Sequence, residues 1–245
     1  MEILGVDIGG SGIKGAPVDI GNGGLVAERH RIPTPQPSTP EAVVKVVADI
    51  ARHFEWQGPI GCTFPAVIKR GVAYTAANVD NAWIGANGEA LVVQETGCPA
   101  LLINDADAAG IAEMEFGAGQ GNRGVVIVLT FGTGIGSAVF TNGQLVPNTE
   151  FGHMGIRGKD AEDRAADRVR KAQDLSWEEW AARVNEFLER MEIVFSPDLF
   201  IIGGGVSKKH KKYLHLLHTQ ADIRPAEMRN QAGIIGAAMA ARLLA

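Results

Sequence analysis

The sequence predicts an α/β protein built as two domains. Segments typical of buried strands alternate with helical segments along the whole chain. A strand, a glycine-rich turn and a second strand open the chain and occur again from about residue 124, which indicates an internal duplication. With 245 residues, 46% of them apolar, the chain is long enough for one large or two small domains with their own cores.

The first half begins with a buried strand and a hairpin. The hairpin turn is Gly21-Asn-Gly-Gly24, whose residue types tolerate the positive φ angles of tight turns. Thr39 followed by Pro40 and Glu41 is typical of a helix start. The expected elements are a strand at 3–8, a hairpin of 14–19 and 25–31, a proline-rich loop at 32–40, a helix ending near 54, strands at 59–64 and 101–103, and a helix at 106–116.

The second half repeats the opening and ends in helices. Ser176 and Glu179 form a capping box before a helix whose apolar residues lie on one face. Residues 232–245 are apolar nearly all round and predict a helix buried between the domains. Strands are expected at 125–130, 137–140 and 199–202. We expect one domain of residues 1–106 together with the helix at 231–245, and a second of residues 107–230.

Composition excludes several classes of protein. Cys62 and Cys98 are too few for a disulfide framework or a cysteine zinc site, which favours a reducing, cytoplasmic location. The N-terminus lacks a signal-peptide pattern, and no apolar stretch has the length of a membrane span. A net charge of −5 argues against general nucleic-acid binding, although a local basic patch could still bind a polyanion.

Three glycine clusters, each following a predicted strand, are candidate phosphate-binding turns. Glycine lets the backbone approach a phosphate, and successive turn N–H groups form an anion-binding nest. A single such cluster is more often a plain tight turn, but three at strand ends favour phosphate. The candidate donor-binding residues of these turns are Gly9, Gly10, Ser11, Gly12, Lys14, Gly132, Thr133, Gly134, Gly204 and Gly205.

The first cluster also matches the dinucleotide fingerprint, but its context excludes that interpretation. The fingerprint Gly10-x-Gly12-x-x-Gly15 must open a helix, whereas Pro17 and the turn at Gly21 predict a hairpin here. No Gly-x₄-Gly-Lys-Ser/Thr motif is present, so a P-loop enzyme is excluded as well. Asp7, at the end of the first strand, could hold Mg²⁺ directly or through water; the alternative is a turn-stabilising aspartate.

Asn104-Asp105 joins a predicted strand to a predicted helix. Either residue could simply cap the helix. Alternatively, Asp105 accepts the proton of a substrate hydroxyl while Asn104 positions the substrate, since a carboxylate orients the nucleophile in phosphoryl transfer. The spacing of Glu150 and His153 suits hydrogen bonds to vicinal hydroxyls, although a solvated loop pair is the default interpretation.

Four lysines, Lys208, Lys209, Lys211 and Lys212, directly follow the third glycine cluster. Such a run is usually a solvated helix face. In a chain of net charge −5, a basic patch beside a phosphate-binding turn would attract a polyanionic donor.

Together these motifs resemble the ROK family of sugar kinases, in the family's order and across the whole chain. The resemblance is carried by Asp7-Ile-Gly-Gly-Ser-Gly-Ile-Lys-Gly15, Asn104-Asp105, Thr130-Phe-Gly-Thr-Gly-Ile-Gly136, Glu150-Phe-Gly-His153 and Ile202-Gly-Gly-Gly-Val206. Three more stretches resemble the branch of the family that uses inorganic polyphosphate: Cys62-Thr-Phe-Pro-Ala66, Ala77-Asn-Val-Asp80 and Trp83-Ile-Gly85.

The resemblance implies an actin-like, hexokinase-type fold, in which two ribonuclease-H-like domains have the active site in the cleft between them. It implies that Asp105 is the catalytic base and that Asn78, Asn104, Asp105, Glu150 and His153 contact the sugar. It also implies that the first two glycine turns bind donor phosphates with Mg²⁺ near Asp7, and that the protein is a homodimer.

The chain departs from the family in two respects. Many members carry a cysteine-rich zinc motif after the His, whereas no cysteine follows His153, so we expect no structural zinc. The family's repressors carry an N-terminal helix-turn-helix, for which a chain that starts in its first strand leaves no room.

The expected reaction is Mg²⁺-dependent phosphorylation of the 6-hydroxyl of glucose, with inorganic polyphosphate as donor and ATP as a second donor. Two alternatives stay open: an ATP-dependent kinase of glucose, mannose or an amino sugar, and a non-catalytic sugar-sensing module.

Overall fold

The chain forms two compact units in the computed structural model, which describes residues 1–76 and 79–245. Unit 1 comprises Met1–Ala112 and Asn230–Ala245, and unit 2 comprises Glu113–Arg229. The first junction falls inside the helix α3 (Asp105–Phe116), and the second falls in the segment before the C-terminal helix.

Unit 1 is an α/β unit with one mixed sheet. Its elements are β1 (Glu2–Gly9), β2 (Gly12–Asp19), β3 (Gly24–Leu25), β4 (His30–Ile32), α1 (Pro40–His53), β5 (Ile60–Phe64), β6 (Ile68–Lys69), β7 (Val72–Ala73), η1 (Asn81–Trp83), α2 (Gly88–Thr96), β8 (Ala100–Asn104), the first part of α3, α7 (Ala232–Ala240) and η6 (Ala241–Leu244), with η5 (Arg229–Gln231) at the junction.

The sheet of unit 1 has the order β3-β2-β1-β5-β8, and β4 also pairs with β2. β1 and β2 form an antiparallel hairpin, whereas β5 and β8 run parallel to β1. The carboxyl ends of β1, β5 and β8 therefore lie at one edge of the sheet. Side chains that follow these strands are collected at that edge.

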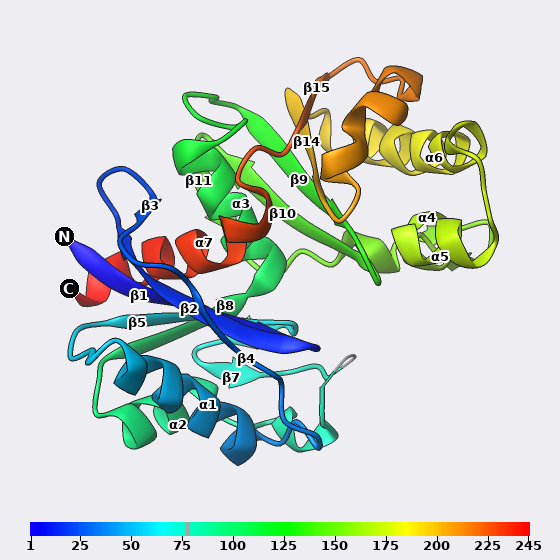
Figure 1. Ribbon diagram of the computed structural model, residues 1–245. Coiled ribbons are helices and arrows are strands. Elements are labelled where there is room, and N and C mark those ends of the chain that lie inside the picture. The colour runs from blue at the N-terminus through cyan, green and yellow to red at the C-terminus, as the bar shows by residue number, and fades with distance from the viewer. Residues whose placement is uncertain (77–78) are drawn as a thin grey trace. The chain divides into compact units, whose positions relative to one another are not determined.

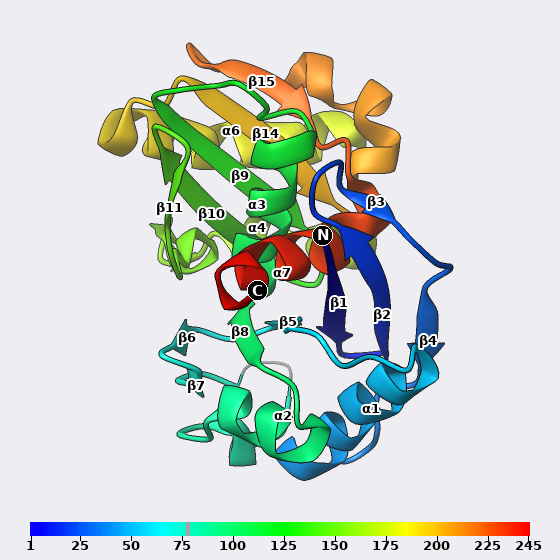
Figure 2. The same ribbon diagram turned by 90° about the vertical axis from the view of Figure 1, so that its left-hand side faces the viewer.

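Helices cover both faces of this sheet (Figure 1, Figure 2). α1 and α2 lie on one face, and their apolar residues join the core with Leu4, Val6 and Phe64. α7 lies on the other face, where Gly61 leaves room for it: a Cβ atom on Gly61 would be 1.9 Å from the carbonyl oxygen of Ala237. α7 packs against β1, β5 and β2, so sheet contacts within unit 1 account for the apolar surface of this helix.

Unit 2 repeats the plan of unit 1. Its elements are the end of α3, β9 (Val125–Phe131), β10 (Ile135–Thr141), β11 (Gln144–Val146), η2 (Phe151–His153), β12 (Gly155–Ile156), β13 (Lys159–Asp160), α4 (Glu162–Ala165), α5 (Asp167–Ala172), α6 (Trp177–Phe195), β14 (Leu199–Gly204), η3 (Ser207–Lys212), η4 (Leu214–Leu216) and β15 (Asp222–Pro225).

The sheet of unit 2 has the order β11-β10-β9-β14-β15. β9 and β10 form an antiparallel hairpin, and β14 and β15 run parallel to β9. The four strands β10-β9-β14-β15 thus repeat the order and the directions of β2-β1-β5-β8. This common topology is the structural counterpart of the duplication that the sequence indicates.

The predicted capping box begins α6. Ser176 Oγ accepts the N–H of Glu179, and the Glu179 carboxylate accepts the N–H of Ser176 over 2.8 Å. The apolar face of α6, with Trp180 and Phe187 fully buried, packs on Ile127 and Leu129 of β9. Capping and amphipathic burial together explain why this segment is the longest helix described.

The structure differs from the predicted elements in several places. The predicted strand at 25–31 is divided into β3 and β4, which both pair with β2. The strands and α-helices that were not predicted are β6, β7, α2, β11, β12, β13, α4, α5 and β15; of these, β6, β7, β12 and β13 have only two residues each and give no periodic signal. The predicted last helix is α-helical only to Ala240. No helix among residues 1–76 and 79–245 is long and apolar enough to cross a bilayer.

Candidate active site

Asp7 lies near the end of β1 and is held by two side chains of unit 1. Its Oδ2 lies 3.0 Å from Lys14 Nζ, and its Oδ1 accepts a hydrogen bond of 2.9 Å from Thr63 Oγ1. Thr63 is fully buried and accepts the N–H of Ile8, so its hydroxyl is oriented toward Asp7. Gly233 of α7 leaves room for this carboxylate, because a Cβ there would be 2.7 Å from Asp7 Cγ.

The first glycine cluster is the turn of the β1–β2 hairpin. Gly9 and Gly12 face each other in the antiparallel register, and Gly10 and Ser11 form the exposed tip. Thr34 Oγ1 donates to the carbonyl oxygen of Gly9 and holds this end of the turn. Lys14 follows on β2, directly opposite Asp7. The predicted donor-binding residues of unit 1 therefore lie together at one end of the hairpin.

Asn104 and Asp105 lie where β8 meets α3. Asn104 is buried, and its Oδ1 accepts the N–H groups of Ala106 and Asp107 at 2.9 and 3.1 Å. Its Nδ2 donates to the carbonyl oxygen of Ala66. Asn104 thus caps α3, which is one of the two roles that the sequence predicts for it. The second hydrogen of its Nδ2 remains available to a substrate. Its role as a sugar ligand stays a prediction.

Asp105 is exposed at the first turn of α3. Its Oδ1 accepts the N–H of Ala106 at 2.9 Å. Because β1, β5 and β8 are adjacent and parallel, Asp105 leaves the same sheet edge as Asp7, two strands away, which is roughly 10 Å at ordinary strand spacing. Unit 1 therefore presents a general-base candidate and a metal-ligand candidate at the same edge of its sheet. Asn78 lies outside the described residues.

The second glycine cluster is the turn of the β9–β10 hairpin in unit 2. The N–H of Gly132 donates to the carbonyl oxygen of Gly134, and Thr133 is exposed between them. The third cluster ends β14, the strand that pairs with β9. Gly204 adopts a φ of 80° directly beside Phe131, and a Cβ on Gly204 would be 2.5 Å from the Phe131 carbonyl oxygen. This close approach, which only glycine allows, brings the second and third clusters together.

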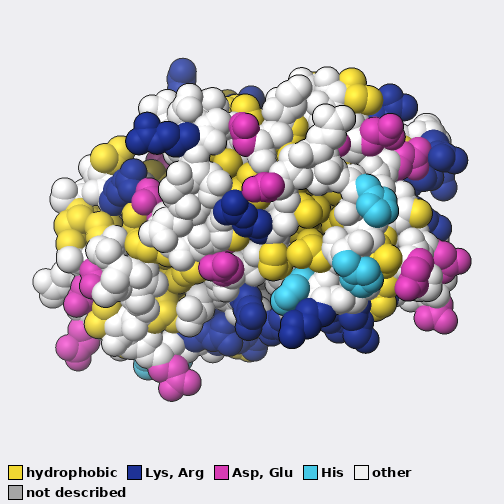
Figure 3. Space-filling view, turned by 90° about the horizontal axis from the view of Figure 1, so that it is seen from above, with side chains coloured by type: hydrophobic (Ala, Val, Ile, Leu, Met, Phe, Trp, Pro, Cys, Tyr) yellow, Lys and Arg dark blue, Asp and Glu magenta, His cyan; other side chains and the backbone are white. Residues whose placement is uncertain are grey.

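The four lysines follow the third cluster in the 3₁₀ turns of η3, where their side chains are exposed. Buried Val206 and Tyr213 anchor the two ends of this segment in the core of unit 2. Figure 3 shows one part of the surface where Lys and Arg side chains gather beside His side chains. The run is a solvated basic surface next to a glycine turn, which is compatible with both interpretations made from the sequence.

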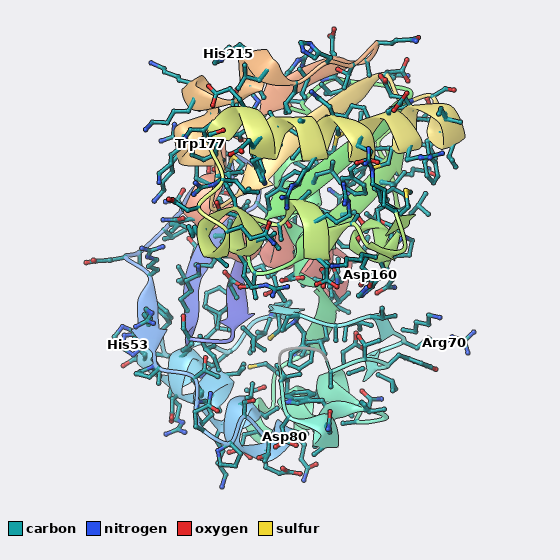
Figure 4. All side chains as sticks on the ribbon, turned by 90° about the vertical axis from the view of Figure 1, so that its right-hand side faces the viewer. His53, Arg70, Asp80, Asp160, Trp177 and His215 are labelled. Carbon is teal, nitrogen blue, oxygen red and sulfur yellow. The ribbon has the colours of Figure 1, made fainter. Side chains whose placement is uncertain are left out.

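Glu150 directly precedes the short helix η2, and His153 is the last residue of that helix. Ser137 Oγ donates to the carbonyl oxygen of Thr149 and accepts the N–H of Phe151, so a buried hydroxyl fixes the chain on both sides of Glu150. His153 Nδ1 lies 2.8 Å from Asp160 Oδ2 on β13, and Asp160 is labelled in Figure 4. This tether leaves Nε2 of His153 available to a substrate.

The electrostatics of this loop are set by several carboxylates. The hydrogen bond that His153 makes to the Asp160 carboxylate raises the pKa of His153, and the charges of Glu162 and Glu150 act in the same direction. Desolvation raises the pKa of Glu150, the nearby Glu162 adds to the rise, and His153 opposes it. Glu150 and His153 therefore influence each other's protonation.

Glu162 is a residue of this site that the sequence did not reveal. Its Oε2 accepts the N–H of Ile135, and a Cβ on Gly134 would be 2.4 Å from the same oxygen. Gly152 packs against the Ile135 carbonyl oxygen and also faces Glu162. A single carboxylate thus joins the second glycine turn to the Glu150 loop. It stands in a charged stretch that has no motif, so only its place in the fold identifies it.

Comparison with known proteins identifies the family of the chain. The model of the ROK family matches residues 3–167. This chain belongs to the ROK family. The resemblance that the motifs predicted is therefore confirmed.

Two of the most similar ROK proteins are named for polyphosphate. The chain is 50% identical over 238 residues to a polyphosphate glucokinase of Mycobacterium tuberculosis, covering 97% of this chain and 90% of that protein. Its structure resembles the inorganic polyphosphate/ATP-glucomannokinase of Arthrobacter sp. strain KM with a TM-score of 0.93 and 46% identity, covering 100% and 99% of the two chains. Similarity to the polyphosphate-using branch is thereby confirmed.

A ROK glucokinase of Streptomyces griseus, crystallised with glucose and AMPPNP, is a more distant structural relative. It matches with a TM-score of 0.82 and 25% identity, covering 99% of this chain and 100% of that one. These matches confirm the predicted fold class, because the ROK family has the actin-like ATPase fold. The two units with one strand order are this chain's version of that fold.

Proposed function

We propose that this ROK protein transfers the terminal phosphoryl group of inorganic polyphosphate to the 6-hydroxyl of glucose, giving glucose 6-phosphate, and that it also accepts ATP. The observation that carries this proposal is the 50% identity to a polyphosphate glucokinase over 97% of the chain. The presence of Asp105, Asp7 and all three glycine turns supports an active enzyme.

In unit 1, Asp105 accepts the proton of the 6-hydroxyl and orients its oxygen for attack on the phosphorus. The bond from this oxygen to phosphorus forms as the bond to the leaving phosphate oxygen breaks, and the leaving oxygen retains the bonding electron pair. Little covalent chemistry is required of the protein, so positioning supplies most of the acceleration. The cap that Asn104 makes on α3 places Asp105 at the carboxyl edge of the sheet.

The family resemblance predicts that the sugar is bound by Asn104, Asp105, Glu150 and His153. Asn78 remains a predicted ligand by resemblance alone. Support in unit 2 comes from the tethers: Ser137 holds the chain around Glu150, and Asp160 orients the imidazole of His153. A carboxylate and an imidazole with fixed directions match vicinal hydroxyls, which can donate to one and accept from the other.

The donor is bound by the glycine turns and Lys14, with the lysines of η3 attracting its chain. Mg²⁺, when bound, would neutralise charge on the donor phosphates. Asp7 fits such an ion: Mg²⁺ in kinases is commonly held by one or two carboxylates, the substrate phosphates and water. Within the described part of the chain, no group of three or more His, Cys, Asp or Glu side chains is placed to hold a metal by itself.

A cytoplasmic location, a homodimer and the domain bounds 1–106 with 231–245 and 107–230 also remain predictions. They rest on the composition, the motifs and the family resemblance rather than on contacts within the chain.

The test is formation of sugar 6-phosphate by the purified protein with Mg²⁺ and either polyphosphate or ATP. Glucose, mannose and an amino sugar are compared as acceptors, and EDTA replaces Mg²⁺ in a control. Transfer from polyphosphate to glucose supports the proposal. Transfer from ATP alone would identify the ATP-dependent alternative, and sugar binding without transfer from either donor would identify a sensing module.

A further inference from the structure

Each hairpin turn that we assign to the donor has an arginine bound to it. In unit 1, Arg31 Nη2 donates to the carbonyl oxygen of Ser11 over 2.9 Å. In unit 2, Arg168 Nε donates to the carbonyl oxygen of Thr133, also over 2.9 Å. Ser11 and Thr133 are the exposed tip residues of their turns. The same arrangement thus occurs in both units, although the two arginines come from different kinds of element.

Arg31 packs closely on the first turn. It lies on β4, opposite Lys14 in the antiparallel register with β2. A Cβ on Gly12 would be only 2.6 Å from Nε and from Nη2 of Arg31, so the guanidinium occupies the space that a side chain at position 12 would need. The glycine therefore has a second function besides permitting a tight turn. Because Gly12 has no side chain, the positively charged guanidinium of Arg31 can pack against the turn.

Arg168 is held at the second turn by its main chain and by its side chain. Its N–H donates to the carbonyl oxygen of Gly132 over 3.0 Å, and its Nη2 lies 3.4 Å from Asp163 Oδ1. About half of its side-chain surface is exposed, at 52%. A guanidinium has five N–H donors, and the contacts to Thr133 and Asp163 use two of them. The exposed remainder is free to meet a ligand at the turn.

Both arginines supply a positive charge, which the backbone groups of the glycine turns lack. Backbone N–H groups at a glycine turn are neutral donors, whereas a polyphosphate carries a negative charge on every phosphate and approaches a chain of net charge −5. A planar guanidinium matches two phosphate oxygens at once and remains charged at every physiological pH. A bond from the guanidinium to the turn carbonyl fixes that charge in place before the donor arrives.

We propose that Arg31 and Arg168 are donor-binding residues, each contacting phosphate oxygens at its own glycine turn. The inference rests on the proposed function, because it takes the two turns as donor sites. It adds two charged ligands to a set that otherwise consists of backbone groups and lysines.

The test for Arg168 compares R168Q, R168K and the wild type. Polyphosphate binding is measured by calorimetry without glucose, and KM for polyphosphate is measured with glucose across a salt series. Loss of a charge-assisted contact should weaken binding about tenfold in R168Q. It should also flatten the salt dependence of KM, because one phosphate contact fewer is made. R168K should recover part of both effects, and R190Q, an exposed charge change on α6, should show neither.

For Arg31, polyphosphate binding and the salt dependence of KM are compared in the same way among R31Q, R31K, the control R52Q and the wild type. Arg52 is exposed near the end of α1 and pairs with Asp49, a contact of little energetic weight at the surface. Thermal midpoints of all variants are recorded, because an arginine that only braces its turn would lower the midpoint in the Lys and Gln variants alike.

Two results would overturn the inference. One is unchanged polyphosphate binding in R31Q and R168Q. The other is equal weakening in the Lys and Gln variants with a lowered thermal midpoint. If the wild type binds ATP but no polyphosphate, the proposed donor is wrong, and the same comparisons made with ATP decide the role of the arginines.

Discussion

Thr63 donates a hydrogen bond of 2.9 Å from its buried hydroxyl to Oδ1 of Asp7, a residue 56 positions earlier in the chain. The same hydroxyl accepts the N–H of Ile8. The two residues are direct neighbours in the parallel register of β1 and β5. Asp7 is thus oriented by Thr63 on one oxygen and by Lys14 on the other.

Replacement of Thr63 by Val should damage both stability and metal use. The variant leaves the Ile8 N–H and one Asp7 oxygen without their partner, which should cost about 1–3 kcal/mol of unfolding free energy. We also expect a higher Mg²⁺ concentration at half-maximal activity, because Asp7 loses its orientation. T63S should behave like the wild type. Denaturant unfolding and Mg²⁺ titration measure the two effects, and a T63V protein normal in both would refute the positioning role.

Asp105→Asn should abolish turnover while leaving glucose affinity nearly unchanged. The amide has almost the shape of the carboxylate but cannot accept the hydroxyl proton, so kcat should fall by at least about 100-fold, the lower end of general-base effects. Glucose binding measured by calorimetry should stay within a few-fold of wild type. A D105N variant with near-normal kcat would show that another group is the base.

Asp160→Asn should lower the pKa of His153. The Asp160 hydrogen bond is the main cause of the raised value, so its loss returns the imidazole toward its ordinary range. At a pH between the two values, less His153 is then protonated. NMR titration of the His153 ring protons, assigned with H153Q, measures the change.

The pH profile of glucose KM should follow this shift in D160N, with its midpoint displaced to lower pH. Because the folded pKa is raised, the His153–Asp160 pair contributes stability at low pH and loses it as the pH rises through that value. The pair is exposed, so the effect on stability should be small. An unshifted titration in D160N would contradict the assignment of Asp160 as the cause.

Neutralising the lysines of η3 should weaken polyphosphate use more than ATP use. The quadruple change of Lys208, Lys209, Lys211 and Lys212 to Gln removes four positive charges beside the third glycine cluster. KM for polyphosphate should rise and become less sensitive to salt, since a long polyanion reaches beyond the turns and a nucleotide does not. A double variant within the run, K208Q/K209Q, is measured as well. Its matched control is K45Q/K69Q, which removes the same number of charges from lysines outside the run. Equal effects on both donors would return the run to a solvated surface.

Gly61→Ala should destabilise unit 1 severely. The added Cβ would lie 1.9 Å from the Ala237 carbonyl oxygen, so α7 would have to move off β5. We expect a loss of about 3 kcal/mol or more, at or beyond the upper end of overpacking costs. Gly155→Ala, where the Cβ meets nothing within 4 Å, is the matched control and should change the thermal midpoint little. A stable G61A protein would mean that the contact with α7 is looser than the structure shows.

Elements and motifs with local signals could be predicted from the amino-acid sequence alone. The capping box at Ser176, the strands at 3–8 and 125–130, and the glycine turns depend on residues a few positions apart, so their patterns can be read directly. The order of the motifs was sufficient to identify the ROK family and its polyphosphate-using branch. The short strands β6 and β7 were not predicted, because two residues are too few to show the alternating pattern of a strand.

Contacts between residues far apart in the chain become evident only in the three-dimensional structure. The bonds from Thr63 to Asp7, from Arg31 to Ser11 and from Arg168 to Thr133 join residues 20 to 56 positions apart. Their partners depend on strand order and register, which place side chains together across a sheet edge regardless of their separation in the chain. The sequence therefore predicts the candidate site motifs, whereas the fold supplies the side chains that bind and orient them.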